Sequence, residues 1–323
     1  MTLKKRSLSG IKPTGTPHLG NYLGMIKPAI KMQETHQTFY FIADYHALTS
    51  IREPESLKEH SYDLTATFAS LGMDFEEHAF FRQSDIPEVT ELTWFLACLT
   101  SKGLMERAHA FKDAQSKGQD VNMGLFSYPI LMAADILIYD SHVVPVGKDQ
   151  KQHLEITRDL ALRFNHLYGE TLVVPEAIIE DQVAVIPGLD GQKMSKSYNN
   201  VIPLFAPEKQ LRKAIMKIET DSKTVEEVKD PESCNVFQLF QCFADQSAQQ
   251  DLAEQYRAGG MGYGTAKQIC FEAIRDELKD ASEHYHQIRG DRAHLEGILE
   301  GGKDKARRVA RDVVDRVRNR VGL

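Results

Sequence analysis

Lys193 and Lys196 are the side chains whose types and spacing point most directly to chemistry. They lie three residues apart in the string KMSKS at 193–197. Proline and glycine residues at 187, 188 and 191 precede the string and predict a loop rather than a rigid element. Two ammonium groups on a loop that closes over a ligand can bind a polyphosphate. Because an isolated lysine pair is more often a solvated basic surface, this interpretation depends on a second motif.

The second motif occupies residues 9–21, which read SGIKPTGTPHLGN. Residues 6–10 are predicted to form a short strand, and the glycine, proline and threonine residues after it a loop. The apolar spacing beyond the loop predicts a helix with buried positions Leu19, Leu23, Ile26 and Ile30. This order presents backbone N–H groups and a positive helix end to a nucleotide. Alone it could be an ordinary tight connection, but with KMSKS downstream it predicts a nucleotide site.

The two motifs together resemble the signatures of class I aminoacyl-tRNA synthetases, with His-Leu-Gly-Asn at 18–21 as the first and KMSKS as the second. Three further segments resemble the tryptophanyl-tRNA synthetase family: FIADYHALT at 41–49, YPILMAADIL at 128–137 and VPVGKDQKQH at 144–153. The resemblance covers roughly residues 7–200; beyond these it rests mainly on length and on GYG at 262–264. It implies activation of L-tryptophan by ATP, with release of pyrophosphate, and transfer to the 3′ end of tRNA(Trp).

The order of elements predicts an α/β fold with a Rossmann-type, doubly wound parallel sheet and a smaller all-helical domain. We expect strands near 6–10, 39–44, 78–84, 143–146 and 172–179, alternating with helices and joined by right-handed crossovers. Past KMSKS the sequence predicts only helices, near 206–218, 235–257, 263–289 and 291–320. At 323 residues the chain is long enough for two domains. We expect a catalytic domain at 1–186, a helical tRNA-recognition domain at 187–295, and a last helix at 296–323 that completes the catalytic domain.

The resemblance implies which residues hold ATP. Activation by in-line attack needs positioning and charge rather than a covalent enzyme intermediate. The implied catalytic residues are His18, Lys193, Lys196 and Lys112. The implied ATP site comprises Lys12, Pro13, Thr14, Gly20, Asn21, Gly147, Lys148, Asp149, Ile186, Lys193, Met194, Ser195, Lys196 and Ser197. Mg²⁺ is expected to enter with ATP, and no structural metal is expected because the sequence shows no carboxylate or cysteine cluster for one.

Asp135 is conspicuous within the apolar helix predicted around 129–139, where an unpaired carboxylate would be costly to bury. It could pair with an arginine or face solvent, or it could accept a hydrogen bond from a substrate. An indole N–H can only donate, so a fixed carboxylate favours tryptophan over phenylalanine. A tyrosine hydroxyl could also donate, which keeps tyrosyl-tRNA synthetase as an alternative. The implied tryptophan pocket comprises Leu8, His46, Tyr128, Met132, Asp135, Val144, Val146 and Gln150.

Two positions depart from the pattern common among bacterial members of the family. Lys12 stands where glutamine is usual, and Ala114, two residues after Lys112, stands where a second lysine is common. We expect Lys12 or Lys117 to supply part of the charge that Ala114 lacks. The alternative is a retuned pocket with weaker activity or a different substrate preference, and a non-charging paralogue with a regulatory binding role stays open.

The net charge of −7 conceals a basic C-terminal helix. Eight basic and three acidic residues lie between Lys303 and Arg320, and valines recur every four residues from Val309 to Val321. Such a helix can be an ordinary amphipathic element, but the resemblance favours transient contact with tRNA phosphates. The resemblance also implies a homodimer. No leader or membrane segment is recognisable, so we expect a cytoplasmic protein with four buried thiols.

Overall fold

The structure is a computed structural model that describes residues 4–116, 118, 121–147, 150–179 and 186–323. Five parallel strands form one sheet in the order β3-β2-β1-β4-β5. The strands are β1 (Arg6–Ile11), β2 (Gln37–Ile42), β3 (Ala79–Arg82), β4 (Val143–Val146) and β5 (Glu176–Ile179). The strand order reverses direction between β1 and β4, where open α/β sheets form a ligand crevice. The predicted doubly wound parallel sheet is confirmed.

Alternate residues of the central strand β2 belong to different faces of the sheet, which explains its continuous apolar sequence. Phe39 and Phe41 belong to a hydrophobic cluster with Leu8 and Phe81, whereas Tyr40 and Ile42 belong to a second cluster with Phe80. Phe41 lies beside Gly10 of β1, where a Cβ atom would approach the Phe41 ring to 2.5 Å. A parallel strand covered on both faces needs apolar residues at every position.

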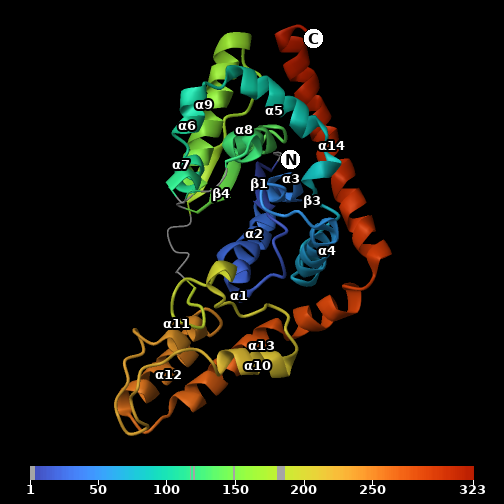
Figure 1. The fold of residues 1–323 in the computed structure, drawn as a ribbon. Helices are drawn as coiled ribbons and strands as arrows, with labels where there is room; N and C mark the ends of the chain where they lie inside the picture. The colour runs from blue at the N-terminus through green and yellow to red at the C-terminus, as the bar shows by residue number, and fades with distance from the viewer. Residues whose placement is uncertain (1–3, 117, 119–120, 148–149, 180–185) are drawn as a thin grey trace.

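Helices cover both faces of the sheet, and further helices follow the KMSKS segment (Figure 1). The chain enters its first helical stretch through α1 (Leu19–Asn21), η1 (Tyr22–Ile26), α2 (Lys27–Lys31) and η2 (Met32–Glu34). The part of the chain before residue 186, which contains the sheet and is called the sheet side below, has these other helical elements: α3 (Asp44–Ala47), α4 (Pro54–Ser70), η3 (Gln83–Asp85), α5 (Glu88–Leu99), α6 (Lys102–Glu106), α7 (His109–Ser116), α8 (Met123–Leu137) and α9 (Lys151–Tyr168).

Beyond residue 186 the described secondary structure is helical apart from isolated bridges. It comprises η5 (Lys196–Tyr198), α10 (Glu208–Ile215), α11 (Asn235–Gln241), α12 (Gln246–Ala258), α13 (Tyr263–Ile288) and α14 (Arg292–Val321). The helix expected at 235–257 is two helices, because Asp245 caps a new one by accepting from the Ala248 N–H. These helices share a third hydrophobic cluster with Leu19 and Tyr22. The division at 187 and 296 stays a prediction.

The C-terminal helix α14 joins all three clusters, since Leu295, Leu299 and Ala306 each belong to a different one. It runs along the edge of the sheet beside β3 (Figure 1). At Gly302 the helix passes so close to β3 that a Cβ atom would lie 1.9 Å from the Phe80 carbonyl oxygen. Only glycine can occupy that position without displacing the helix.

The basic residues of α14 are largely paired with acidic residues of the sheet side. Glu88 accepts hydrogen bonds from Arg307 at 2.8 Å and from Arg311 at 3.2 Å. Arg316 pairs with Asp140, and Arg318 pairs with Glu91. Four charges that were expected to face tRNA are therefore neutralised within the chain, which removes the main argument for tRNA contact along this helix.

Candidate active site

His18 opens the first helical stretch as its N-cap. Its Nδ1 accepts the Asn21 backbone N–H at 3.3 Å, and the Asn21 side-chain oxygen accepts the His18 N–H at 3.2 Å. This reciprocal pair fixes the imidazole ring at the end of the glycine-rich loop. Because Nδ1 is an acceptor, the neutral ring carries its proton on Nε2.

The imidazole of His18 is neutral at physiological pH. Burial, and then the nearby Lys196 ammonium, lower the pKa of His18 from its ordinary 6.5 to about 4. The side chain is therefore a hydrogen-bond donor through Nε2 rather than a positive charge. A phosphate group placed beside this ring would therefore have its charge balanced mainly by lysine.

Asn200 organises the KMSKS segment. Its side chain accepts the Ser195 N–H at 2.8 Å and donates to Asp190 at 2.7 Å and to the Lys193 carbonyl at 3.1 Å. The segment also forms an antiparallel bridge between Pro187 and Lys193. The loop that we expected to be free to close is thus tied internally by hydrogen bonds. Nothing in the sequence motif itself identified Asn200.

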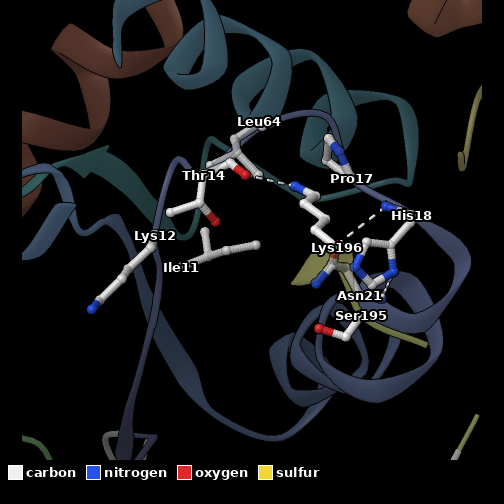
Figure 2. A pocket seen from close by; sticks show the side chains of 10 residues that line it. Ile11, Lys12, Thr14, Pro17, His18, Asn21, Leu64, Ser195 and Lys196 are labelled. Carbon is white, nitrogen blue, oxygen red and sulfur yellow. Dashed lines mark hydrogen bonds between the residues drawn. The ribbon is translucent and has the colours of Figure 1, made fainter. Parts of the chain in front are cut away.

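The two loops meet at a cavity of about 190 Å³ (Figure 2). The Lys196 ammonium donates to the Thr14 carbonyl at 2.8 Å and lies against Gly15, whose φ of +101° favours glycine. On the other side, the Gly20 N–H lies 3.2 Å from the sulfur of Met194. The cavity is lined by Ile11, Lys12, Thr14, Gly15, Pro17, His18, Asn21, Leu64, Ser195 and Lys196.

Asp135 is the centre of a second polar cluster, buried beyond the ends of β2 and β3. Its carboxylate is 1% exposed and accepts from His46 Nε2 at 2.8 Å. The Gln83 side-chain amide donates to both carboxylate oxygens, at 2.8 and 2.9 Å. Burial raises the pKa of Asp135, while the hydrogen bonds from His46 and Gln83 oppose that shift. Of the alternatives that the sequence left open for Asp135, solvent exposure is excluded, and its partners in the described structure are a histidine and an amide rather than an arginine.

A third group links α8 to α9. The Tyr128 hydroxyl is hydrogen-bonded to His153 Nε2, and His153 Nδ1 lies 3.1 Å from the Gln150 side-chain oxygen. The ring of Tyr128 also meets the edge of His46, with centroids 6.1 Å apart. The predicted pocket residues on three separate segments are thereby connected to one another.

Comparison with known proteins assigns this arrangement to a family. A family model described as "tRNA synthetases class I (W and Y)" matches residues 3–279. A tryptophan–tRNA ligase of Rhodopirellula baltica is 51% identical over 318 residues, which cover 98% of this chain and 99% of that protein. The chain belongs to the class I tryptophanyl-tRNA synthetase family.

Solved structures agree with that assignment. A tryptophanyl-tRNA synthetase of Campylobacter jejuni, complexed with ADP and tryptophan, has a TM-score of 0.93 and 47% identity, covering 98% of this chain and all of that one. A tyrosyl-tRNA synthetase of Archaeoglobus fulgidus, complexed with L-tyrosine, has a TM-score of 0.67 at 20% identity. The second likeness shows only that the two families share a fold.

The structure brings several of the ATP residues predicted for this synthetase together and leaves others apart. Several of the predicted residues do not line the cavity. Met194 is hydrogen-bonded to two others among them: its sulfur lies near the Gly20 N–H, and its own N–H donates to the Ile186 carbonyl. The Pro13 carbonyl is hydrogen-bonded to the His60 side chain. Lys193 is exposed, and so is Lys112 on α7. The Ser197 hydroxyl is hydrogen-bonded to the Ser195 hydroxyl. Gly147 follows β4, whereas Lys148 and Asp149 lie outside the described residues.

Lys12 is directed toward Tyr128 of α8. Its ammonium lies 6.0 Å from the centroid of the Tyr128 ring, and in Figure 2 it points away from His18 and Lys196. Desolvation lowers its pKa although the side chain as a whole is exposed. Lys12 thus lines the cavity while its ammonium faces Tyr128, and the expected compensation for Ala114 stays a prediction.

The apolar residues predicted for the tryptophan pocket belong to, or pack against, one hydrophobic cluster. Leu8, Val144 and Val146 are buried in the hydrophobic cluster that includes neighbours of Asp135 on α8, and Met132 packs against it. Sequence reasoning missed Gln83, which lies on η3 just after β3. A polar residue directly after an apolar strand was the available signal, because strand ends meet at the crevice. His153 was visible within its motif but was not assigned.

Proposed function

We propose that this synthetase activates L-tryptophan with ATP and transfers it to the 3′ end of tRNA(Trp). The observation that carries the ATP step is the contact of Lys196 with the Thr14 carbonyl beside His18, because it joins both signature loops around one cavity. The amino acid follows from relatives named as tryptophan–tRNA ligases and from the acceptor at Asp135.

Activation requires attack by the tryptophan carboxylate on the α-phosphorus of ATP. The bond between that phosphorus and the bridging oxygen breaks, and pyrophosphate leaves with the bonding electrons. In this proposal the ammonium groups of Lys196 and Lys193 neutralise charge on the departing pyrophosphate, and the His18 Nε2–H donates to phosphate oxygen. Lys193 reaches pyrophosphate only after the KMSKS unit moves further toward the cavity. Mg²⁺ enters with ATP as part of the substrate.

Selection of tryptophan depends on Asp135. Gln83 and His46 hold its carboxylate in one orientation, and a carboxylate can accept more hydrogen bonds than these three. The remaining acceptor position is proposed to take the indole N–H, with Tyr128 and Gln150 toward the amino-acid backbone. Tyrosine is the alternative donor. A non-charging paralogue is disfavoured because the groups that serve ATP chemistry are assembled.

The second step needs tRNA, and we place its recognition in the helical region rather than along α14. We also propose a homodimer. Trp94 on α5 is 68% exposed and Met123 on α8 is 73% exposed, and these helices pack against each other. Cys98 on α5 is exposed as well, contrary to the expectation of four buried thiols. Large apolar side chains in solvent are typical of a subunit interface.

Two remaining expectations concern metals and location. Among the described residues no group of three or more histidine, cysteine or acidic side chains could hold a metal ion. No described helix is long and apolar enough to cross a bilayer. Cytoplasmic location is part of the proposal.

Aminoacylation tests the complete proposal. Purified protein is incubated with ATP, radiolabelled tryptophan and a tRNA(Trp) transcript, and acid-precipitable label is counted. We expect charging of tRNA(Trp) and none of a tRNA(Tyr) transcript with tyrosine. Charging of tRNA(Tyr) instead would establish the alternative, and charging of neither, despite adenylate formation, would leave only the first step.

A further inference from the structure

Asp63 on α4 lies where three distant parts of the chain meet. Its buried carboxylate accepts from Arg289 Nε at 2.6 Å and from the Tyr285 hydroxyl at 3.0 Å, both at the C-terminal end of the α13 region. The other carboxylate oxygen accepts the Thr16 hydroxyl at 3.4 Å, in the glycine-rich loop. One carboxylate therefore bonds both the helical region and the nucleotide loop.

The loop is held by α4 at further positions on the same face. His60, three residues before Asp63, lies 3.2 Å from the Pro13 carbonyl, and Leu64 lines the nucleotide cavity. Thr16 lies between Thr14, which accepts from Lys196, and His18. A shift of Thr16 would therefore move Thr14 and His18, two of the residues that line the cavity.

The junction also has room to move. A cavity of about 120 Å³ lies beside the network, with walls from Thr16, Thr67 on α4, Tyr285 on α13 and the segment around Leu204. Dense packing therefore does not by itself fix the relative positions of these elements. The polar network of Asp63 adds directional contacts to the packing of Tyr285 against Phe205.

We propose that Asp63 is a positioning residue for ATP, which couples the end of α13 to the loop that forms the nucleotide cavity. α13 belongs to the core of the helical region, so displacement of that region changes the fit of ATP. The charge of Asp63 also acts on Lys196, where it opposes the lowering of the lysine pKa by burial. This inference rests on the proposed function only in taking ATP as the ligand.

A neighbouring ion pair provides a matched control. Arg292, the first residue of α14, pairs with Glu59 on α4 at 2.5 Å, one helical turn before Asp63. This pair joins α4 to the start of α14 and does not include the loop. Glu59→Gln should therefore loosen the junction without altering the nucleotide cavity.

The test compares Asp63→Asn, Arg289→Gln, Thr16→Val and Glu59→Gln in the full-length protein. Calorimetry with a non-hydrolysable ATP analogue measures nucleotide affinity, and titration with tryptophan alone measures amino-acid affinity. We expect Asp63→Asn to weaken analogue binding roughly tenfold, within the range of coupling between contacting residues, with tryptophan affinity nearly unchanged. Thr16→Val should weaken analogue binding similarly. The double variant Thr16→Val with Asp63→Asn should bind the analogue little more weakly than either single variant. Glu59→Gln should change analogue binding by less than about twofold.

Arg289→Gln separates coupling from a local loop effect, because Arg289 does not touch the loop and is half exposed. Weaker analogue binding in this variant supports the proposal. Unchanged analogue binding in Arg289→Gln, whatever Asp63→Asn does, or equal losses in Glu59→Gln, overturns it. Analogue binding is measured without catalysis, so failure of the coupling is distinguishable from failure of the enzyme to use tryptophan.

Discussion

The Gln83 side-chain amide lies 2.8 Å from Oδ1 and 2.9 Å from Oδ2 of Asp135, although 52 residues separate them in the chain. Gln83 also accepts the Tyr45 N–H at 3.1 Å, so the amide is itself oriented by the start of α3. A buried acid in such a setting is held in a single rotamer. The selectivity proposed for Asp135 therefore depends on Gln83 as well.

Asp135→Asn should weaken tryptophan binding far more than ATP binding. The asparagine amide can present N–H₂ to the indole donor, so the loss is about 1.5–3 kcal/mol, the contribution of a hydrogen bond to a charged group. Calorimetric titration with tryptophan measures it. An unchanged Kd would remove Asp135 from the pocket.

Gln83→Met should also weaken tryptophan binding, because it removes two donors from a buried carboxylate that burial already disfavours. Ser84→Ala is the matched control, since Ser84 bonds Asp44 rather than Asp135. Equal losses of affinity in the two variants would show that this segment matters only for folding.

The pH dependence of stability should report the neutral state of His18. Its folded pKa of about 4 lies below the unfolded value of 6.5, so the unfolded chain binds more protons between these values. As pH falls through this window, wild type should lose up to about 3 kcal/mol of unfolding free energy relative to His18→Asn, which keeps a helix-capping side chain. Urea unfolding at several pH values measures this, and a constant difference would contradict it.

Lys196→Ala and Lys193→Ala should each slow adenylate formation by something on the order of 10²-fold. Tryptophan affinity should stay nearly intact, because a clamp that meets pyrophosphate as it departs stabilises the transition state. Single-turnover kinetics measure the rate, with the exposed Lys209→Ala on α10 as control. Weaker tryptophan binding with an unchanged rate of adenylate formation would show that these lysines do not act on the departing pyrophosphate.

Glu88→Gln should lower the free energy of unfolding by about 1–3 kcal/mol at pH 7, because it removes the anion shared by two arginines of α14. Although desolvation acts in the opposite direction, hydrogen bonds from Arg307 and Arg311 hold the pKa of Glu88 below its ordinary 4.5. The effect should persist above pH 4.5 and disappear as pH falls toward the lowered value. The exposed Glu300→Gln should change stability by less than about 0.5 kcal/mol. Equal losses of unfolding free energy in Glu88→Gln and Glu300→Gln would contradict the idea that Glu88 stabilises the packing of α14 through its two arginines.

The parts of the site that could be predicted lie in short motifs. His18 and Lys196 were found because their roles are encoded by neighbours within a few residues, and the strands were found because β1 to β4 carry buried apolar runs. Asn200 was missed because its partners are near in sequence, but the loop conformation that joins them is not encoded in the KMSKS string. Gln83 and Asp63 were missed for another reason: their partners are distant in the chain and are brought to them only by folding. For the same reason the valine spacing of α14 predicted a helix but could not show that Glu88 and Asp140 neutralise its arginines.

The most direct test of the central claim is amino-acid-dependent exchange of pyrophosphate into ATP, measured with tryptophan, tyrosine and phenylalanine in parallel. Exchange reads the activation step alone and needs no tRNA. We predict rapid exchange with tryptophan, far slower exchange with tyrosine and none with phenylalanine, which offers no donor to Asp135. Faster exchange with tyrosine than with tryptophan, or exchange with none of the three, would contradict the account.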